Sequence, residues 1–158
     1  MKEQSGTGTG LDYRDRVPLK GTLHYRIIKN GQILEEVEDE NLIVTLGRVQ
    51  LARLLAGNFT NRNVNRIAFG TNGTAPKLTD TTITGSYMKN VSAIEYPADG
   101  VVQFNWKLET TEANGKAILE FGLICADSSL FSRRVRESGK AINKESDISL
   151  DGYWRIEF

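Results

Sequence analysis

Val102-Gln-Phe-Asn-Trp-Lys-Leu108 is the stretch of the sequence that decides the fold. Its apolar residues stand at every second position and are separated by Gln103, Asn105 and Lys107. A period of two is typical of a β-strand that has one face in a core and the other in solvent. The stretch therefore predicts a half-buried strand, which needs neighbouring strands to satisfy its backbone hydrogen bonds.

A hairpin is predicted upstream of this strand. The segment 23–27 alternates apolar and polar residues, and Asn30-Gly31 follows it. This pair accepts the positive φ angles that a tight hairpin turn requires. The returning strand, 33–37, leads into the acidic segment 35–40, which is typical of a solvated sheet edge.

Four further segments have the composition of strands. The segment 118–126 is almost uniformly apolar, which is typical of a central strand. The others are shorter or alternate, and loops rich in glycine, asparagine and threonine separate them. The predicted strands are 64–70, 118–126, 130–136 and 153–158.

One short helix is predicted after the hairpin. Thr45 is a plausible N-cap, and Gly57 stands where a left-handed C-terminal cap is common. Between them, Gly47, Leu51, Leu54 and Leu55 follow the spacing of one helical face. The expected fold is therefore mainly β: an antiparallel β-sandwich-like domain with one short inserted α-helix and an N-terminal arm.

The domain is predicted to span residues 21–158, after a flexible N-terminal arm of residues 1–20. Ser5–Gly10 alternates glycine with threonine or serine and cannot form a core. Leu11, Tyr13 and Val17 then supply apolar side chains that could dock on another surface. Two interpretations stay open, a disordered terminus and an arm that orders against a neighbouring subunit.

Composition narrows the classes of partner. Twenty basic residues balance twenty acidic ones, so the chain lacks the basic excess typical of nucleic-acid binders. No stretch is apolar over the roughly 20 residues that a membrane span needs, and the N-terminus has no signal-peptide core. We therefore expect no nucleic-acid partner, no membrane, and folding in a cytoplasm. Cys125 stands in an apolar run and is expected to be a buried thiol.

The sequence contains no recognisable catalytic constellation. His24 is the only histidine, and no Gly-x-Ser-x-Gly segment accompanies it. The glycine-rich segments 5–10 and 70–74 lack the context of dinucleotide or phosphate loops. We therefore predict no enzyme, no catalytic, cofactor-binding or metal-binding residues, and no cofactor, with a structural or surface role for His24.

Arg133-Arg134-Val-Arg136 is the densest charge cluster. It could bind an anion, a polysaccharide or the acidic segment 35–40 of another subunit, or it could be the exposed end of a strand. Arg133 has the same parity as inward-facing Phe131, which suggests that the strand twists or ends there. The candidate assembly contacts are Leu11, Tyr13, Val17, Arg133, Arg134 and Arg136.

From about Asn41 onward the sequence resembles small virion proteins encoded near the tail-fibre and baseplate genes of tailed bacteriophages. The resemblance covers roughly three-quarters of the chain, with its segments in the expected order. The segments that carry it include Asn41-Leu-Ile-Val-Thr-Leu-Gly47, Val64-Asn-Arg-Ile-Ala-Phe-Gly-Thr-Asn-Gly-Thr-Ala-Pro76, Glu112-Ala-Asn-Gly115, Glu120-Phe-Gly-Leu-Ile-Cys125, Leu130-Phe-Ser-Arg-Arg-Val135 and Tyr153-Trp-Arg-Ile-Glu-Phe158.

This resemblance implies a non-enzymatic structural protein of a phage tail, as a baseplate, fibre-attachment or collar component. It further implies localisation to the virion, with oligomeric assembly among its own copies and other tail proteins. A phage-derived contractile device fits the same segments. The alternative is a carbohydrate- or receptor-binding β-sandwich module, in which Tyr87, Tyr96 and Tyr153 would supply stacking faces.

Overall fold

The computed structural model describes residues 18–158, apart from the side chain of Ser138. The mainly β fold expected from the sequence is confirmed. In residues 18–158 the elements are β1 (Lys20–Lys29), β2 (Gln32–Ile43), α1 (Thr45–Leu55), β3 (Val64–Gly70), β4 (Tyr87–Asn90), β5 (Ala93–Ala98), β6 (Val101–Leu108), β7 (Ala117–Ile118), β8 (Glu120–Cys125), β9 (Leu130–Val135), the 3₁₀ turn η1 (Glu137–Gly139), β10 (Ile142–Asn143) and β11 (Ile148–Glu157).

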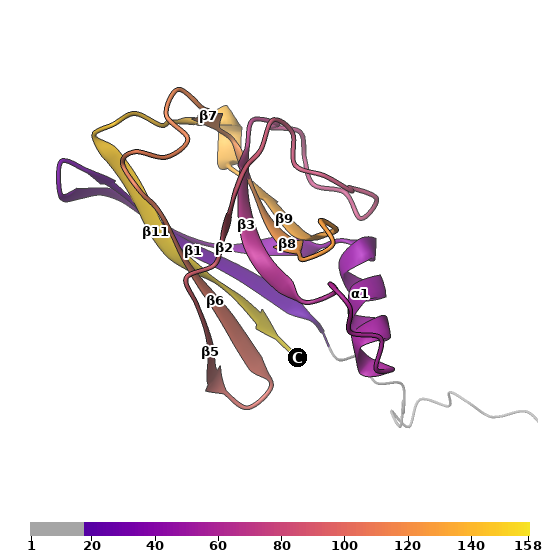
Figure 1. Cartoon of the computed structure of the whole chain (residues 1–158). Coiled ribbons are helices and arrows are strands. Elements are labelled where there is room, and N and C mark those ends of the chain that lie inside the picture. Colours follow the sequence, from indigo (N-terminus) through magenta and orange to yellow (C-terminus); the bar gives the residue numbers. More distant parts are fainter. Residues whose placement is uncertain (1–17) are drawn as a thin grey trace, which may run out of the picture.

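Nine of these strands form one curled antiparallel sheet in the order β4-β3-β8-β9-β2-β1-β11-β6-β5. Strand β2 joins its two halves, because Leu42 and Ile43 pair with β9 while residues 32–41 pair only with β1. The halves face each other across the core and diverge towards α1, the β5–β6 hairpin and the C-terminus (Figure 1). The remaining strands, β7 and β10, form a small separate pair.

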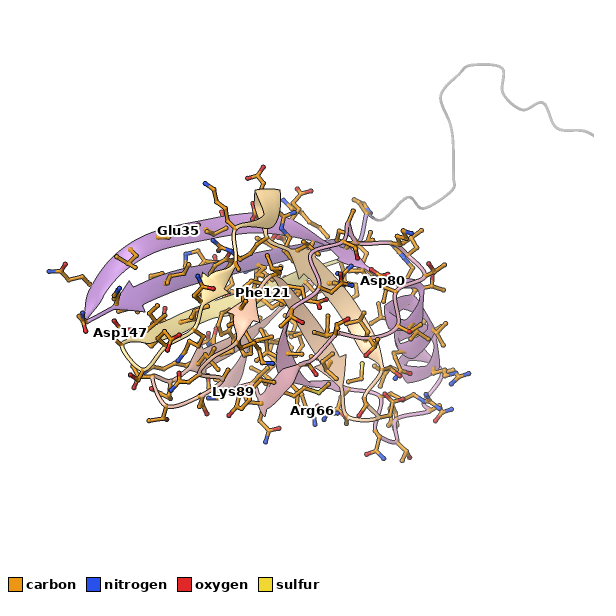
Figure 2. All side chains as sticks on the ribbon, turned by 90° about the horizontal axis from the view of Figure 1, so that it is seen from above. Glu35, Arg66, Asp80, Lys89, Phe121 and Asp147 are labelled. Carbon is orange, nitrogen blue, oxygen red and sulfur yellow. The ribbon has the colours of Figure 1, made fainter. Side chains whose placement is uncertain are left out.

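Aromatic side chains fill the space between the two halves. Phe121 lies in the middle of the molecule (Figure 2), and its ring packs 4.8 Å from that of Tyr25 and 5.8 Å from that of Phe69. Trp106 and Trp154 are also buried in this core. The alternation predicted for the stretch 102–108 is confirmed in part, since Phe104, Trp106 and Leu108 face the core while Val102 is half-buried.

The predicted hairpin is formed by β1 and β2. Asn30 and Gly31 have φ angles of 49° and 79°, as the tight turn between the strands requires. The acidic segment 35–40 lies on the part of β2 that has β1 as its single neighbour in the sheet. Its carboxylates therefore flank a free backbone edge, as expected from the sequence.

The predicted helix is present, but its first residue is shifted. Val44 occupies the N-cap position, and Thr45 is already the first helical residue. The helix packs on β9, where Gly47 is needed because a Cβ there would lie 2.3 Å from the Phe131 carbonyl oxygen. Leu55 does not join the buried stripe and is 91% exposed. Gly57 closes the helix with a φ of 86°, as predicted.

A bulge in β9 places Arg133 on the face of the sheet opposite to that of Phe131. The pairing with β8 shifts register between Leu130 and Ser132, which leaves Phe131 as an extra residue. Phe131 therefore faces the central core, whereas Arg133 points to the opposite face of the sheet. Simple alternation along the strand would place Arg133 on the same face as Phe131. It does not hold here, because a bulge changes the face of every residue that follows it.

Candidate functional site

Arg133 is the centre of a buried ionic network on the outer face of β8 and β9. Arg133 is 1% exposed, although the sequence analysis expected a surface contact. Its Nε lies 2.8 Å from Glu120 Oε1, and its Nη1 lies 2.8 Å from Asp80 Oδ2. In this conformation Arg133 therefore has no surface to offer a neighbouring protein.

The network fastens the long loop 71–86 to the sheet. Glu120 Oε2 accepts hydrogen bonds from the backbone N–H groups of Asn72 (2.8 Å) and Thr84 (3.1 Å). Arg133 Nη2 donates to the carbonyl oxygens of Asn72 (3.2 Å) and Thr74 (3.1 Å). Both buried ions thus have several partners, which is the condition under which a buried ion pair is tolerated.

Small residues let the loop approach the sheet closely. A Cβ at Gly122 would lie 2.5 Å from Ile83 Cγ1, and a Cβ at Gly70 would lie 2.4 Å from Ile83 Cγ2. Ile83 is itself buried in a second apolar cluster with Ile124 and Leu130. The loop therefore covers the outer face of this half of the sheet with both ionic and apolar contacts.

Asp80 is held in its charged form by the same network. Burial raises its pKa, but the hydrogen bonds from the Lys77 N–H and the Arg133 guanidinium outweigh burial, so that the pKa falls below its ordinary value of 3.8. Figure 2 shows Asp80 near the α1 end of the molecule, on the loop that covers the sheet. The charged carboxylate holds the loop in place, because its Oδ2 accepts from both Lys77 N–H and Arg133.

The other two candidate arginines pair with the acidic segment of their own chain. Arg134 lies 3.0 Å from Asp39, and Arg136 Nη2 lies 3.2 Å from Glu35. Arg136 also donates to the hydroxyl of Tyr25 at 2.6 Å. The suggested contact with segment 35–40 of another subunit is thus an intramolecular contact here, and Arg134 keeps the more exposed side chain of the two.

Lys144 is a second buried cation with a structural role. Its Nζ donates to Asn114 Oδ1 at 2.8 Å and to the carbonyl oxygens of Thr110 (3.3 Å) and Glu145 (3.1 Å). Burial is the main reason that its pKa lies below the ordinary value of 10.5. These contacts hold the turn after β6 against the segment that precedes β11.

The outer face of β1 and β11 carries polar and aromatic side chains. His24 Nε2 lies 2.7 Å from Glu36 Oε2, and the imidazole stacks on the ring of Tyr153 at 4.8 Å. The guanidinium of Arg155 lies 4.8 Å from the same ring. Tyr153 therefore has its ring occupied by neighbours, and His24 makes the contacts of a surface strand residue.

The remaining candidate tyrosines differ in exposure. Tyr87 is half-buried against the core, whereas Tyr96 on β5 is 78% exposed. Among the three tyrosines considered for sugar stacking, Tyr96 alone presents an open ring. Leu11, Tyr13 and Val17 lie outside the described residues.

An apolar groove opens where the two halves of the sheet diverge. It has a volume of about 240 Å³, between α1 on one side and β5, β6 and the end of β11 on the other. Phe104 and Phe131 line it together with side chains nearer the surface. The latter come from segments far apart in the sequence and include two polar residues: Leu51, Leu54, Arg62, Asn63, Ile94, Tyr96 and Phe158.

Large apolar side chains surround this groove. Ile94 is 47% exposed and Phe158 is 56% exposed, and both line it. Leu55 and Phe59, at and beyond the C-terminal end of α1, are also exposed. Sequence reasoning missed this surface, although Ile94-Glu-Tyr96 alternates apolar and polar residues and could have indicated a strand with an apolar face.

Other sites for chemistry are limited within the part of the chain that the structure describes. Burial, followed by the charge of Asp127, raises the pKa of the Cys125 thiol to about 12, so the thiol stays protonated at neutral pH. Across residues 18–158 no group of three histidine, cysteine, aspartate or glutamate side chains is placed to hold a metal ion. The helical segments of the same residues include none long and apolar enough to cross a membrane.

Comparisons with protein-family models, with curated protein sequences and with solved structures find no match to this chain. The fold class therefore comes from the structure itself. The likeness to phage tail proteins stays a prediction from the sequence segments that carry it.

Proposed function

We propose that this chain is a non-enzymatic structural protein that assembles through the apolar end of its domain. The observation that carries the proposal is the groove between α1 and β5, with Ile94, Tyr96 and Phe158 exposed around it. Large exposed apolar patches on folded domains mark surfaces that bind other proteins. Burial of apolar area is the main favourable term in such association.

The charged groups of the domain support a structural role. Four charged side chains are buried and form hydrogen bonds with other parts of the same domain: Glu120, Arg133, Arg136 and Lys144. A catalytic or ligand-binding group would need a free polar atom directed at a substrate. The groove is lined mainly by apolar side chains, with Arg62 and Asn63 as its polar members, which suits a protein partner that covers apolar area.

The proposed setting is the tail of a bacteriophage virion or of a phage-derived contractile device. This part rests on the sequence segments between Asn41 and Phe158 that resemble small tail proteins. Mass spectrometry of intact particles, sedimented from a lysate of the source, tests it. A constant ratio of this chain to a major tail protein supports the setting, and absence of the chain from intact particles contradicts it.

Self-association through the groove can be tested on the purified full chain. Ile94→Glu places a charge on the groove, and Ile33→Glu is the matched control because Ile33 is 53% exposed at the tip of the β1–β2 hairpin. We expect sedimentation velocity over a wide concentration range to show that only Ile94→Glu loses oligomers. Equal loss in both variants, or a wild-type chain that stays monomeric, contradicts the proposal.

Tyr96 is the specific observation that favours a second candidate, a carbohydrate-binding module. Its open ring lies beside Phe158 and could stack on the apolar face of a sugar. Thermal unfolding in the presence of purified bacterial surface polysaccharide tests this candidate. A rise in melting temperature that Tyr96→Ser abolishes supports it, and no rise removes it.

A further inference from the structure

The described chain begins at the same end of the molecule as the apolar groove. Pro18 and Leu19 line a shallow hollow together with Phe158, and Phe158 also lines the groove. Leu19 is partly buried against the core, so it fixes the point at which the N-terminal segment leaves the domain. Seventeen residues, 1–17, precede this point.

The direction of departure follows from the pairing of β1 with β11. Lys20 pairs with Glu157, at the very end of β11. Pro18 and Leu19 therefore lead to the end of the sheet at which β11 finishes.

The segment 11–17 has the chemistry that the groove needs. In an extended chain, Leu11, Tyr13 and Val17 share one side, because side chains alternate between two sides. Asp15 lies on the same side as these three, whereas Asp12, Arg14 and Arg16 fall on the other side, which would face water. Seven extended residues span roughly 23 Å, long enough to place two apolar anchors in one groove.

We propose that residues 11–17 of one copy occupy the apolar groove of a neighbouring copy, with Leu11 and Tyr13 as its anchors. A neighbouring copy is the partner because the proposed function is association between copies through this groove. The inference rests on the proposed function, since it names the partner of the same groove.

Photo-cross-linking of the full chain tests the arrangement directly. Tyr13→benzoylphenylalanine is introduced, and chains labelled with heavy isotopes are mixed with unlabelled chains before irradiation. We expect cross-linked peptides that join position 13 of one isotopic form to Ile94, Tyr96 or Phe158 of the other. Cross-links confined to chains of one isotopic form in such a mixture, or cross-links to other surfaces, overturn the inference.

Native mass spectrometry of the same sample separates this inference from the proposed function. A sample that is monomeric at every concentration overturns both proposals. An oligomeric sample that lacks cross-links between position 13 and the groove overturns only the proposal that residues 11–17 occupy the groove of a neighbouring copy. It leaves assembly through the groove in place.

Substitution in the segment supplies a second measurement. Tyr13→Ser should weaken association by about tenfold or more, as is usual for the loss of an aromatic anchor from the centre of an interface. Lys2→Ser is the control outside the proposed contact and should leave association unchanged. Equal association of Tyr13→Ser and the wild-type chain overturns the inference.

Discussion

The outer face of β8 and β9 and the groove beside α1 both present apolar side chains, but within residues 18–158 the chain covers only the outer face. Over β8 and β9, loop 71–86 lies on the sheet and buries Ile83 against Ile124 and Leu130. At the groove, Ile94 and Phe158 stay partly exposed. The two regions therefore use apolar area differently: one contributes to the stability of the fold, and the other is the surface that we propose for binding.

Buried charges help to keep loop 71–86 on the outer face of β8 and β9. Arg133 and Glu120 are almost fully buried, and each ion depends on the loop for part of its hydrogen bonding. If the loop lifts, these groups lose partners while the sheet still shields them from much of the water. In the described part of the chain, the one ion pair at a lining residue of the groove is the looser contact of Arg62 with Asp127, at 3.9 Å.

Among the substitutions that test this contrast, removal of one partner of the buried ion pair should lower the free energy of unfolding most. Arg133→Ala leaves Glu120 buried without its cation, and we expect the free energy of unfolding to fall by about 3–5 kcal/mol. Urea unfolding measures this change. Arg134→Ala is the control, because the pair of Arg134 with Asp39 is partly exposed, and its loss should be at most about 1 kcal/mol. Similar losses in the two variants would show that the buried network does not hold the loop.

Steric interference under the loop should have a smaller effect. Gly122→Ala places a methyl group 2.5 Å from Ile83 Cγ1, and we expect a loss of about 1–3 kcal/mol from overpacking. Gly73→Ala is the matched control, because its Cβ would meet nothing closer than Leu119 Cδ1 at 3.5 Å. Urea unfolding of both variants tests the close approach, and a Gly122→Ala variant as stable as the control would contradict it.

Acid should loosen the covered face through Asp80. Its pKa in the folded chain lies below the ordinary value of 3.8, so its contribution to stability is fully present above that value. The contribution disappears as the pH falls through the lowered pKa, because the unfolded chain then gains more protons than the folded chain. Asp80→Asn should therefore be less stable than wild type at neutral pH, with a difference that shrinks in strong acid. A difference independent of pH would rule out this role of the charge.

The smallest effect on stability should come from the groove. Ile94 lies on the edge strand β5, where all six residues are exposed, so Ile94→Glu should change the free energy of unfolding by less than about 1 kcal/mol. Thermal unfolding at a concentration where the chain is monomeric provides the measurement. A larger loss would mean that the groove end belongs to the folding core, and the contrast between the two regions would weaken.

Local patterns predicted the individual strands where one face was buried. The strand 64–70 was predicted with its observed bounds, and 118–126 contains β8 with all six residues buried. The turn Asn30-Gly31 was predicted from its tolerance of positive φ alone. In each case the deciding interaction lies within a few residues of chain, which is the range over which periodicity and turn chemistry are informative.

The groove and the buried network around Arg133 could not be predicted from local sequence patterns. Strand β5 was missed because its six residues are all exposed, so that burial imposes no pattern on them. The groove joins Leu51, Ile94 and Phe158, which come together only through the topology of the whole sheet. Arg133 was misjudged because the bulge at Phe131 is not encoded by any glycine or proline. Glu120, a charged residue at the start of an apolar run, was the available signal of a buried partner.

The pairing of β1 with β11 has a consequence for the order of events during synthesis. Lys20 and Glu157 are neighbours in the sheet, so β1 leaves the ribosome long before its partner exists. Such non-local pairing slows folding, and the two halves can close only after β11 has been made. Because Ile156 and Phe158 line the groove, a nascent chain has no complete groove before its last residues are made. The proposed association through the groove would therefore have to follow the folding of each copy.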